Sequence, residues 1–167
     1  MGILSTEGAT TLTVPHPSQA PALLGGTFTT PWFAVDGERV KDFEKASYHD
    51  EYPHAYEGED GYGEDLVEGF HLLSLLDVLC NHSVWSEGPW IAWNYGLDNV
   101  RFVSVIRTTD PFRIHGEVRE VIDRGEQGHL VVTDLRAEVR GRERPGFVAT
   151  QRALWSTVRT ARERPRA

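Results

Sequence analysis

Cysteine is almost absent from this sequence: the 167 residues contain only Cys80. An internal disulfide and a multi-cysteine metal site are therefore both excluded, which fits a reducing compartment. Long hydrophobic runs are also missing, because no apolar stretch approaches the roughly 18 residues that a transmembrane helix needs. Residues 1–10 lack the basic and apolar segments of a signal peptide. We therefore predict a soluble, cytoplasmic protein.

Basic residues are few, with 17 Lys and Arg against 25 Asp and Glu, for a formal net charge of −8. This charge disfavours nucleic acid and anionic membranes as partners. The distribution is uneven, since residues 1–100 carry a net charge of −13 and residues 101–167 a net charge of +5. The two halves are thus complementary, within one fold or between two copies of it.

The length predicts one domain with a sizeable core. Residues 1–26 are rich in Ser, Thr, Pro, Ala and Gly and read as a loosely held leader, or as a segment that crosses to a partner subunit. Residues 27–158 form the predicted domain, and residues 159–167 a charged tail.

The pattern of apolar residues predicts an α+β fold. A strand over 27–35 precedes a short amphipathic helix over 38–47, and a long acidic loop over 48–66 leads to a helix over 68–81 that is apolar almost all round. The remainder reads as strands, separated by turn signals, at 90–95, 100–107, 112–123, 129–140 and 147–158. Such strands form one curved antiparallel sheet that wraps around the single hydrophobic helix.

The acidic loop and the start of the apolar helix hold the densest set of titratable groups. His49, Asp50, His54 and Glu68 are the candidate catalytic residues. The neighbouring Tyr52 and Tyr56 can desolvate His54 and are candidate substrate contacts. The alternative is that the acidic side chains only keep the loop solvated.

Gly69 opens the apolar helix, where free backbone N–H groups and the helix dipole can bind a developing oxyanion. The alternative is that Gly69 only permits close contact between helix and sheet. Trp93 is a candidate wall of an apolar substrate tunnel, with Asn94 beside it. No HExxH or CxxC spacing is present, so neither a metal nor a cofactor is predicted.

A resemblance covers residues 27–157. Residues 43–76, with Gly-Phe-x-x-Leu-Ser-Leu-Leu from Gly69, precede Asn-Tyr-Gly-Leu-Asp-x-Val-Arg-Phe from Asn94. This combination resembles the MaoC-like hot-dog family of (R)-specific enoyl-thioester hydratases and dehydratases, in the branch related to nodulation protein N. The resemblance implies a hot-dog fold.

In that family an Asp and a His, five positions apart, activate water, and a His-Gly pair opens the core helix. The Asp position falls on His49, the His position on His54, and the His-Gly pair on Glu68-Gly69. Only His54 and Gly69 match. The resemblance therefore implies His54 as acid/base group and the Gly69 N–H as oxyanion donor, with Asp50 or Glu68 as the carboxylate partner.

Three functions follow from this reading. The first is a hydratase- or dehydratase-type lyase, without cofactor, that acts on an acyl thioester linked to coenzyme A or a carrier protein, or on a polyketide-like intermediate. The second is a hot-dog thioesterase that uses Glu68, and the third a cyclase or a non-catalytic binding module. An open sheet edge further predicts a homodimer with the site at its interface.

Overall fold

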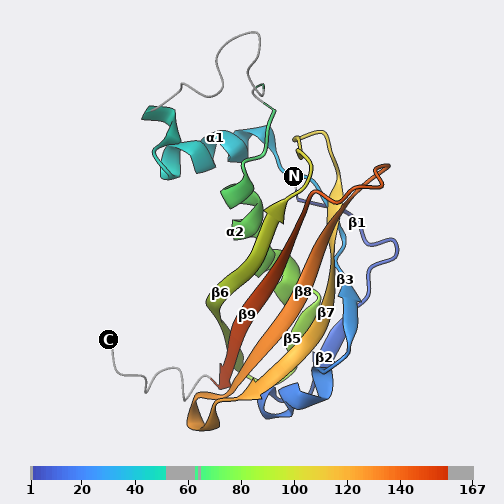
Figure 1. The fold of residues 1–167 in the computed structure, drawn as a ribbon, viewed down its shortest axis with the longest axis vertical. Helices are drawn as coiled ribbons and strands as arrows, with labels where there is room; N and C mark the ends of the chain where they lie inside the picture. Colours follow the sequence, from blue (N-terminus) through green and yellow to red (C-terminus); the bar gives the residue numbers. More distant parts are fainter. Residues whose placement is uncertain (1, 52–62, 64, 158–167) are drawn as a thin grey trace.

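The computed structural model describes residues 2–51, 63 and 65–157, and Figure 1 shows its single long helix crossing a curved sheet. The helices are α1 (Gly37–Ala46) and α2 (Gly69–Asn81), with 3-10 turns η1 (Pro17–Leu23), η2 (His49–Glu51) and η4 (Gly125–Gln127). The strands are β1 (Ile3–Ser5), β2 (Leu12–Val14), β3 (Thr27–Thr29), β4 (Trp32–Phe33), β5 (Val84–Ser86), β6 (Trp90–Phe102), β7 (Phe112–Asp123), β8 (His129–Val139) and β9 (Phe147–Thr157).

Seven strands form the main sheet in the order β1-β4-β7-β8-β9-β6, and β3 also pairs with β7. All its pairings are antiparallel. Strands β2 and β5 make a separate parallel pair. Within the described residues β6 pairs with β9 alone, so it lies at one edge of the sheet, opposite β1.

The core lies between α2 and the sheet. Leu72, Leu76 and Leu79 are buried on α2 at helical spacing. On β7, Phe112 and Ile114 point into the same core because alternate residues of a strand share a face. The α+β architecture that the sequence predicts is confirmed.

The strands predicted over 27–35, 90–95 and 100–107 differ from the structure by more than one residue, and the last of them ends at Phe102. The strand expected over 27–35 is divided into β3 and β4 at Thr30 and Pro31, since proline cannot donate to the ladder. The turn expected over 96–99 is absent, because β6 runs through it. The pairing of β6 with β9 shifts register between Asn94 and Gly96 and again between Asp98 and Arg101, so the strand continues with local irregularities. Asn99, in the second of them, has a φ of 54°.

The segment expected as a loosely held leader packs against the fold instead. β1 pairs with β4, β2 pairs with β5, and Ala20 and Leu23 of η1 are buried in the core. The composition of the segment is typical of a loop. A few of its apolar side chains nevertheless pack against residues far away in the sequence and hold it on the domain. The charged tail lies outside the described residues.

Among the described residues, no helix is both long enough and apolar enough to cross a membrane.

Candidate active site

Glu68 is the residue at which α2 begins. Its backbone is extended, and its carbonyl accepts the first helical hydrogen bond from Leu72 N at 3.0 Å. The side chain makes no capping hydrogen bond to the helix, although it is only 8% exposed. A carboxylate is thus held, nearly buried, at the positive end of the core helix.

His49 faces this carboxylate from η2. Its Nδ1 atom lies 3.6 Å from Oε2 of Glu68 and 2.7 Å from Oγ of Ser47. The Ser47 hydroxyl donates to the carbonyl of Phe43 at 2.7 Å, so Ser47 Oγ is left to accept from the His49 Nδ1–H. This bond holds the imidazole with its Nδ1 edge facing Glu68.

A second carboxyl group, Glu44 of α1, interacts electrostatically with both Glu68 and His49. Burial raises its pKa above the ordinary value, and the negative charges of Glu68 and Asp50 add to that rise, while His49 and Lys41 oppose it. Asp50 itself is exposed in η2. The sequence alone does not point to Glu44, because the closeness of Glu44 to Glu68 depends on how α1 packs on α2.

His71 is a further residue that the sequence analysis did not select. Its ring stacks on Phe43 with centroids 4.4 Å apart and planes 9° apart, and the residue is 6% exposed. Burial lowers its pKa, against the opposing charge of Glu68. Its Nδ1 has no hydrogen-bond partner among the described residues. The signal in the sequence is a titratable side chain two positions after Gly69, in the first turn of a mostly apolar helix.

Gly69 is in close contact with Phe102 from β6. A side-chain carbon at Gly69 would lie 2.5 Å from Cζ of that ring. The structure thus supports the reading in which glycine permits close packing of helix and sheet. The role of its N–H as an oxyanion donor stays a prediction.

A cleft of about 450 Å³ lies between α2 and β6. Asn94 lines it, whereas Trp93, also exposed on β6, is not part of its wall. The wall is made by Phe70, Leu73, Ser74, Leu76, Asp77, Asn94, Tyr95, Gly96, Leu97 and Gln151.

The structure therefore brings His49, Glu68 and Gly69 together at the start of α2, with Asp50 nearby. His54, Tyr52 and Tyr56 lie outside the described residues, and the roles predicted for them stay predictions. The part of the chain that the structure describes contains no group of three or more His, Cys, Asp or Glu side chains suited to a metal ion.

No family model matches the sequence. Curated relatives do: nodulation protein N from Rhizobium leguminosarum bv. viciae is 27% identical over 133 residues, covering 76% of this chain and 80% of the relative. The 3-hydroxyacyl-thioester dehydratase Z of Mycobacterium tuberculosis is 26% identical over 121 residues, covering 71% and 80%.

Solved structures share the fold. The R-hydratase of Pseudomonas aeruginosa in its unliganded form superposes with a TM-score of 0.61 at 14% identity, covering 80% of this chain and 82% of that one. A MaoC-like dehydratase from Rhodospirillum rubrum gives a TM-score of 0.57 at 13% identity, covering 86% and 94%. These likenesses support a relation to the MaoC-like hot-dog family, which is the family that the resemblance implied. The hot-dog fold is confirmed.

Proposed function

We propose that this MaoC-like hot-dog protein is a hydratase- or dehydratase-type lyase that acts on an acyl thioester, with Glu68 as its proton-transferring carboxylate. Two facts support the reaction class: a curated relative is named a 3-hydroxyacyl-thioester dehydratase, and a structural relative is an R-hydratase. The single observation that carries the proposal is the position of the Glu68 carboxylate, nearly buried at the start of α2 and beside His49.

Each group has a defined task in the hydration direction. The oxygen of a water molecule adds to C3 of the enoyl chain while Glu68 accepts one of the water protons. The electrons of the double bond move onto the thioester carbonyl oxygen, which the Gly69 N–H and the helix dipole stabilise. Glu68 then returns the proton to C2, and dehydration runs the same steps in reverse. His54 completes the site by polarising the water.

The neighbours of Glu68 fit this role. His49, held by Ser47, keeps an imidazole beside the carboxylate that cycles between charged and neutral forms. Glu44, whose pKa burial and the neighbouring charges raise, holds its proton to a higher pH than an ordinary carboxyl group does.

The cleft along α2 receives the acyl chain. Its wall combines apolar side chains such as Leu73 and Leu97 with a few polar groups, Asn94 among them. The cleft lies between α2 and the edge strand β6, on which Trp93, Tyr95 and Phe102 are exposed. We propose that a second copy pairs along this edge and closes the cleft, which gives a homodimer. The thioester carrier, coenzyme A or a carrier protein, enters from solvent.

The test is an assay of the purified chain against crotonyl- and 3-hydroxyacyl-thioesters that follows enoyl absorbance. Glu68→Gln should lower kcat by about 10²–10⁴-fold with little change in KM, because the amide cannot accept a proton. The matched control is Glu51→Gln, which removes an exposed carboxylate from the same segment as His49 and should leave turnover unchanged. Equal turnover of Glu68→Gln and wild type would overturn the proposal.

Thioesterase activity is the second candidate, because a carboxylate at the start of the core helix can also activate water toward the thioester carbonyl. The two reactions separate in one experiment. A thioesterase releases free thiol without change in the double bond, whereas a hydratase consumes the enoyl absorbance and keeps the thioester intact.

A further inference from the structure

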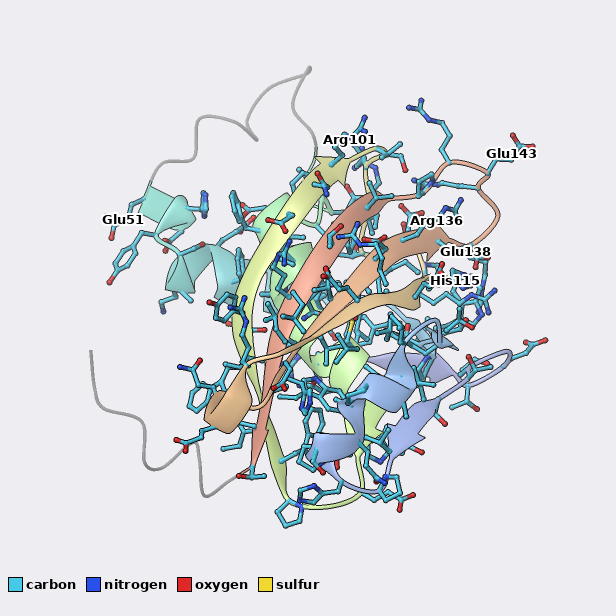
Figure 2. All side chains as sticks on the ribbon, turned by 60° about the horizontal axis from the view of Figure 1, so that its bottom comes forward. Glu51, Arg101, His115, Arg136, Glu138 and Glu143 are labelled. Atoms are coloured by element: carbon cyan, nitrogen blue, oxygen red, sulfur yellow. The ribbon has the colours of Figure 1, made fainter. Side chains whose placement is uncertain are left out.

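A second group of interacting polar side chains lies on the sheet face opposite α2. On β7, Phe112 and Ile114 point into the core, so the alternating residues Arg113 and His115 point to the outer face. In Figure 2, His115, Arg136 and Glu138 lie together on one side of the molecule, while Glu51, next to the candidate active site, lies on the other. This outer-face group is therefore separate from Glu68.

Three of these side chains form a continuous hydrogen-bonded chain across β3, β7 and β8. Oγ1 of Thr29 lies 3.1 Å from Nδ1 of His115, and Nε2 of the same ring lies 2.5 Å from Oε2 of Glu138. Thr29 and His115 are directly paired in the ladder, and His115 reaches diagonally to Glu138. The backbone register thus fixes the order hydroxyl, imidazole, carboxylate.

The carboxylate determines which imidazole nitrogen carries the proton. Arg113 Nε donates to Oε2 of Glu138 at 2.7 Å, which keeps the carboxylate ionised and in place. An ionised carboxylate can only accept, so in the neutral ring Nε2 carries the hydrogen and Nδ1 has a free lone pair. That lone pair faces the Thr29 hydroxyl, which is the geometry of an activated hydroxyl nucleophile.

The group lines a cleft into which a substrate can bind. The cleft measures about 390 Å³ and includes Thr29, His115 and Arg136 in its wall. Arg136 stands directly opposite His115 in the ladder, and one of its NH2 hydrogens is donated to the carbonyl of Glu143 at 3.2 Å. Its guanidinium charge remains available to stabilise a negative oxygen in the cleft.

We propose that this outer cleft is a second acyl-transfer site, in which Thr29 attacks the carbonyl carbon of a small acyl ester. The Thr29 Oγ–C bond forms as the hydroxyl proton passes to Nδ1 of His115, and Arg136 stabilises the oxyanion. The bond between that carbon and the leaving oxygen breaks, and the leaving group departs as an alcohol with the proton from His115. Water then adds by the same route, which releases a carboxylic acid and regenerates Thr29.

The experiment incubates the full chain with p-nitrophenyl acetate and measures p-nitrophenol release, with peptide mapping by mass spectrometry to locate any acetyl group. Wild type should carry acetyl on Thr29. Thr29→Val should abolish that label, whereas Thr29→Ser should keep acylation at residue 29. His115→Gln should slow acylation by about 10²–10⁴-fold. Thr13→Val, which changes an exposed threonine on another strand, is the control and should leave the rate unchanged.

Each other outcome counts against the proposal. Acetylation only at lysine or histidine side chains, or none at all, would overturn it. Labelling of Thr29 at an equal rate in wild type and His115→Gln would also overturn it, because the hydroxyl would then react without the imidazole. Circular dichroism of every variant, with Thr29→Ser as the reference for an intact strand, separates loss of the nucleophile from loss of the fold.

Discussion

The ring of Phe102 lies directly against Gly69, so the last residue of β6 contacts the first residue of α2. This contact joins the edge strand to the start of the core helix. The Glu68 carboxylate and the N-terminal N–H groups of α2 therefore keep a fixed position relative to the cleft between α2 and β6. Site and fold depend here on the same small residue.

The first prediction concerns this contact. Gly69→Ala places a methyl group 2.5 Å from the present position of the Phe102 ring, so the ring must move. We expect a loss of about 1–3 kcal/mol in the free energy of unfolding, typical of overpacking, and a fall in turnover. The double variant Gly69→Ala with Phe102→Leu should recover much of the stability, as a urea-melt double-mutant cycle would measure. If the effects of the two substitutions on the free energy of unfolding were strictly additive, the contact between Gly69 and Phe102 would be contradicted.

The second prediction concerns Glu44. Its raised pKa means that the folded state binds the Glu44 proton more tightly than the unfolded state, so stability is lost as the pH rises through the folded pKa. Glu44→Gln should therefore stabilise the protein at neutral pH, by no more than about 1 kcal/mol for this partly exposed group. The difference should disappear in acid below 4.5, the ordinary value. Thermal melts across this pH range provide the measurement.

Glu38, in the first turn of the same helix, is the control for Glu44. Its charge favours the positive end of the helix dipole, so Glu38→Gln should lower stability slightly. Stabilisation by both substitutions would show that a general reduction of negative charge, and not the burial of Glu44 and its closeness to Glu68, is responsible.

Most of the long elements were predictable from sequence because their patterns are regular, although the thirteen-residue β6 was predicted as two strands. β7 was predicted at its observed bounds, β8 and β9 end within one residue of expectation, and α2 begins one residue later than expected. The three-residue strand β5 was not predicted. Its partner β2 is far away in sequence, and three residues carry no periodic signal.

Candidate site residues that belong to a local sequence motif were predictable. Those that join the site only through the packing of two helices were not. Glu68 and Gly69 were identified from the start of the apolar helix. Glu44 and His71 belong to the site because α1 lies across α2, as the stacking of Phe43 on His71 shows. Neither helix encodes that crossing by itself, so the two residues remained ordinary helix positions in the sequence.

The third prediction concerns the pH dependence that Glu138 gives to stability. Burial alone would raise its pKa, but hydrogen bonds from His115 and Arg113 outweigh burial and hold the pKa below the ordinary 4.5. The stabilisation is present above pH 4.5 and is lost as the pH falls through the lower, folded value. Glu138→Gln should cost roughly 1–3 kcal/mol at neutral pH and progressively less in acid. Glu117→Gln, an exposed neighbour on β7, should show no such pH-dependent difference in urea melts.

The last prediction concerns the open edge of the sheet. β6 is thirteen residues long and exposes Tyr95 at 56%, and such an edge with apolar side chains favours pairing with another strand. Light scattering should give the mass of two chains. Tyr95→Glu, which places a charge in the apolar contact, should weaken association by at least about tenfold, because burying an unpaired charge costs several kcal/mol.

Ile3→Glu is the control for Tyr95→Glu, since Ile3 is 53% exposed on β1 at the opposite edge of the same sheet. That variant should keep the mass of two chains. If both variants dissociate, the contact is not specific to β6, and a monomeric wild type would contradict the dimer outright. Because β6 also forms one wall of the cleft, the dissociated Tyr95→Glu protein should also lose turnover, and concentration-dependent activity would link assembly to catalysis.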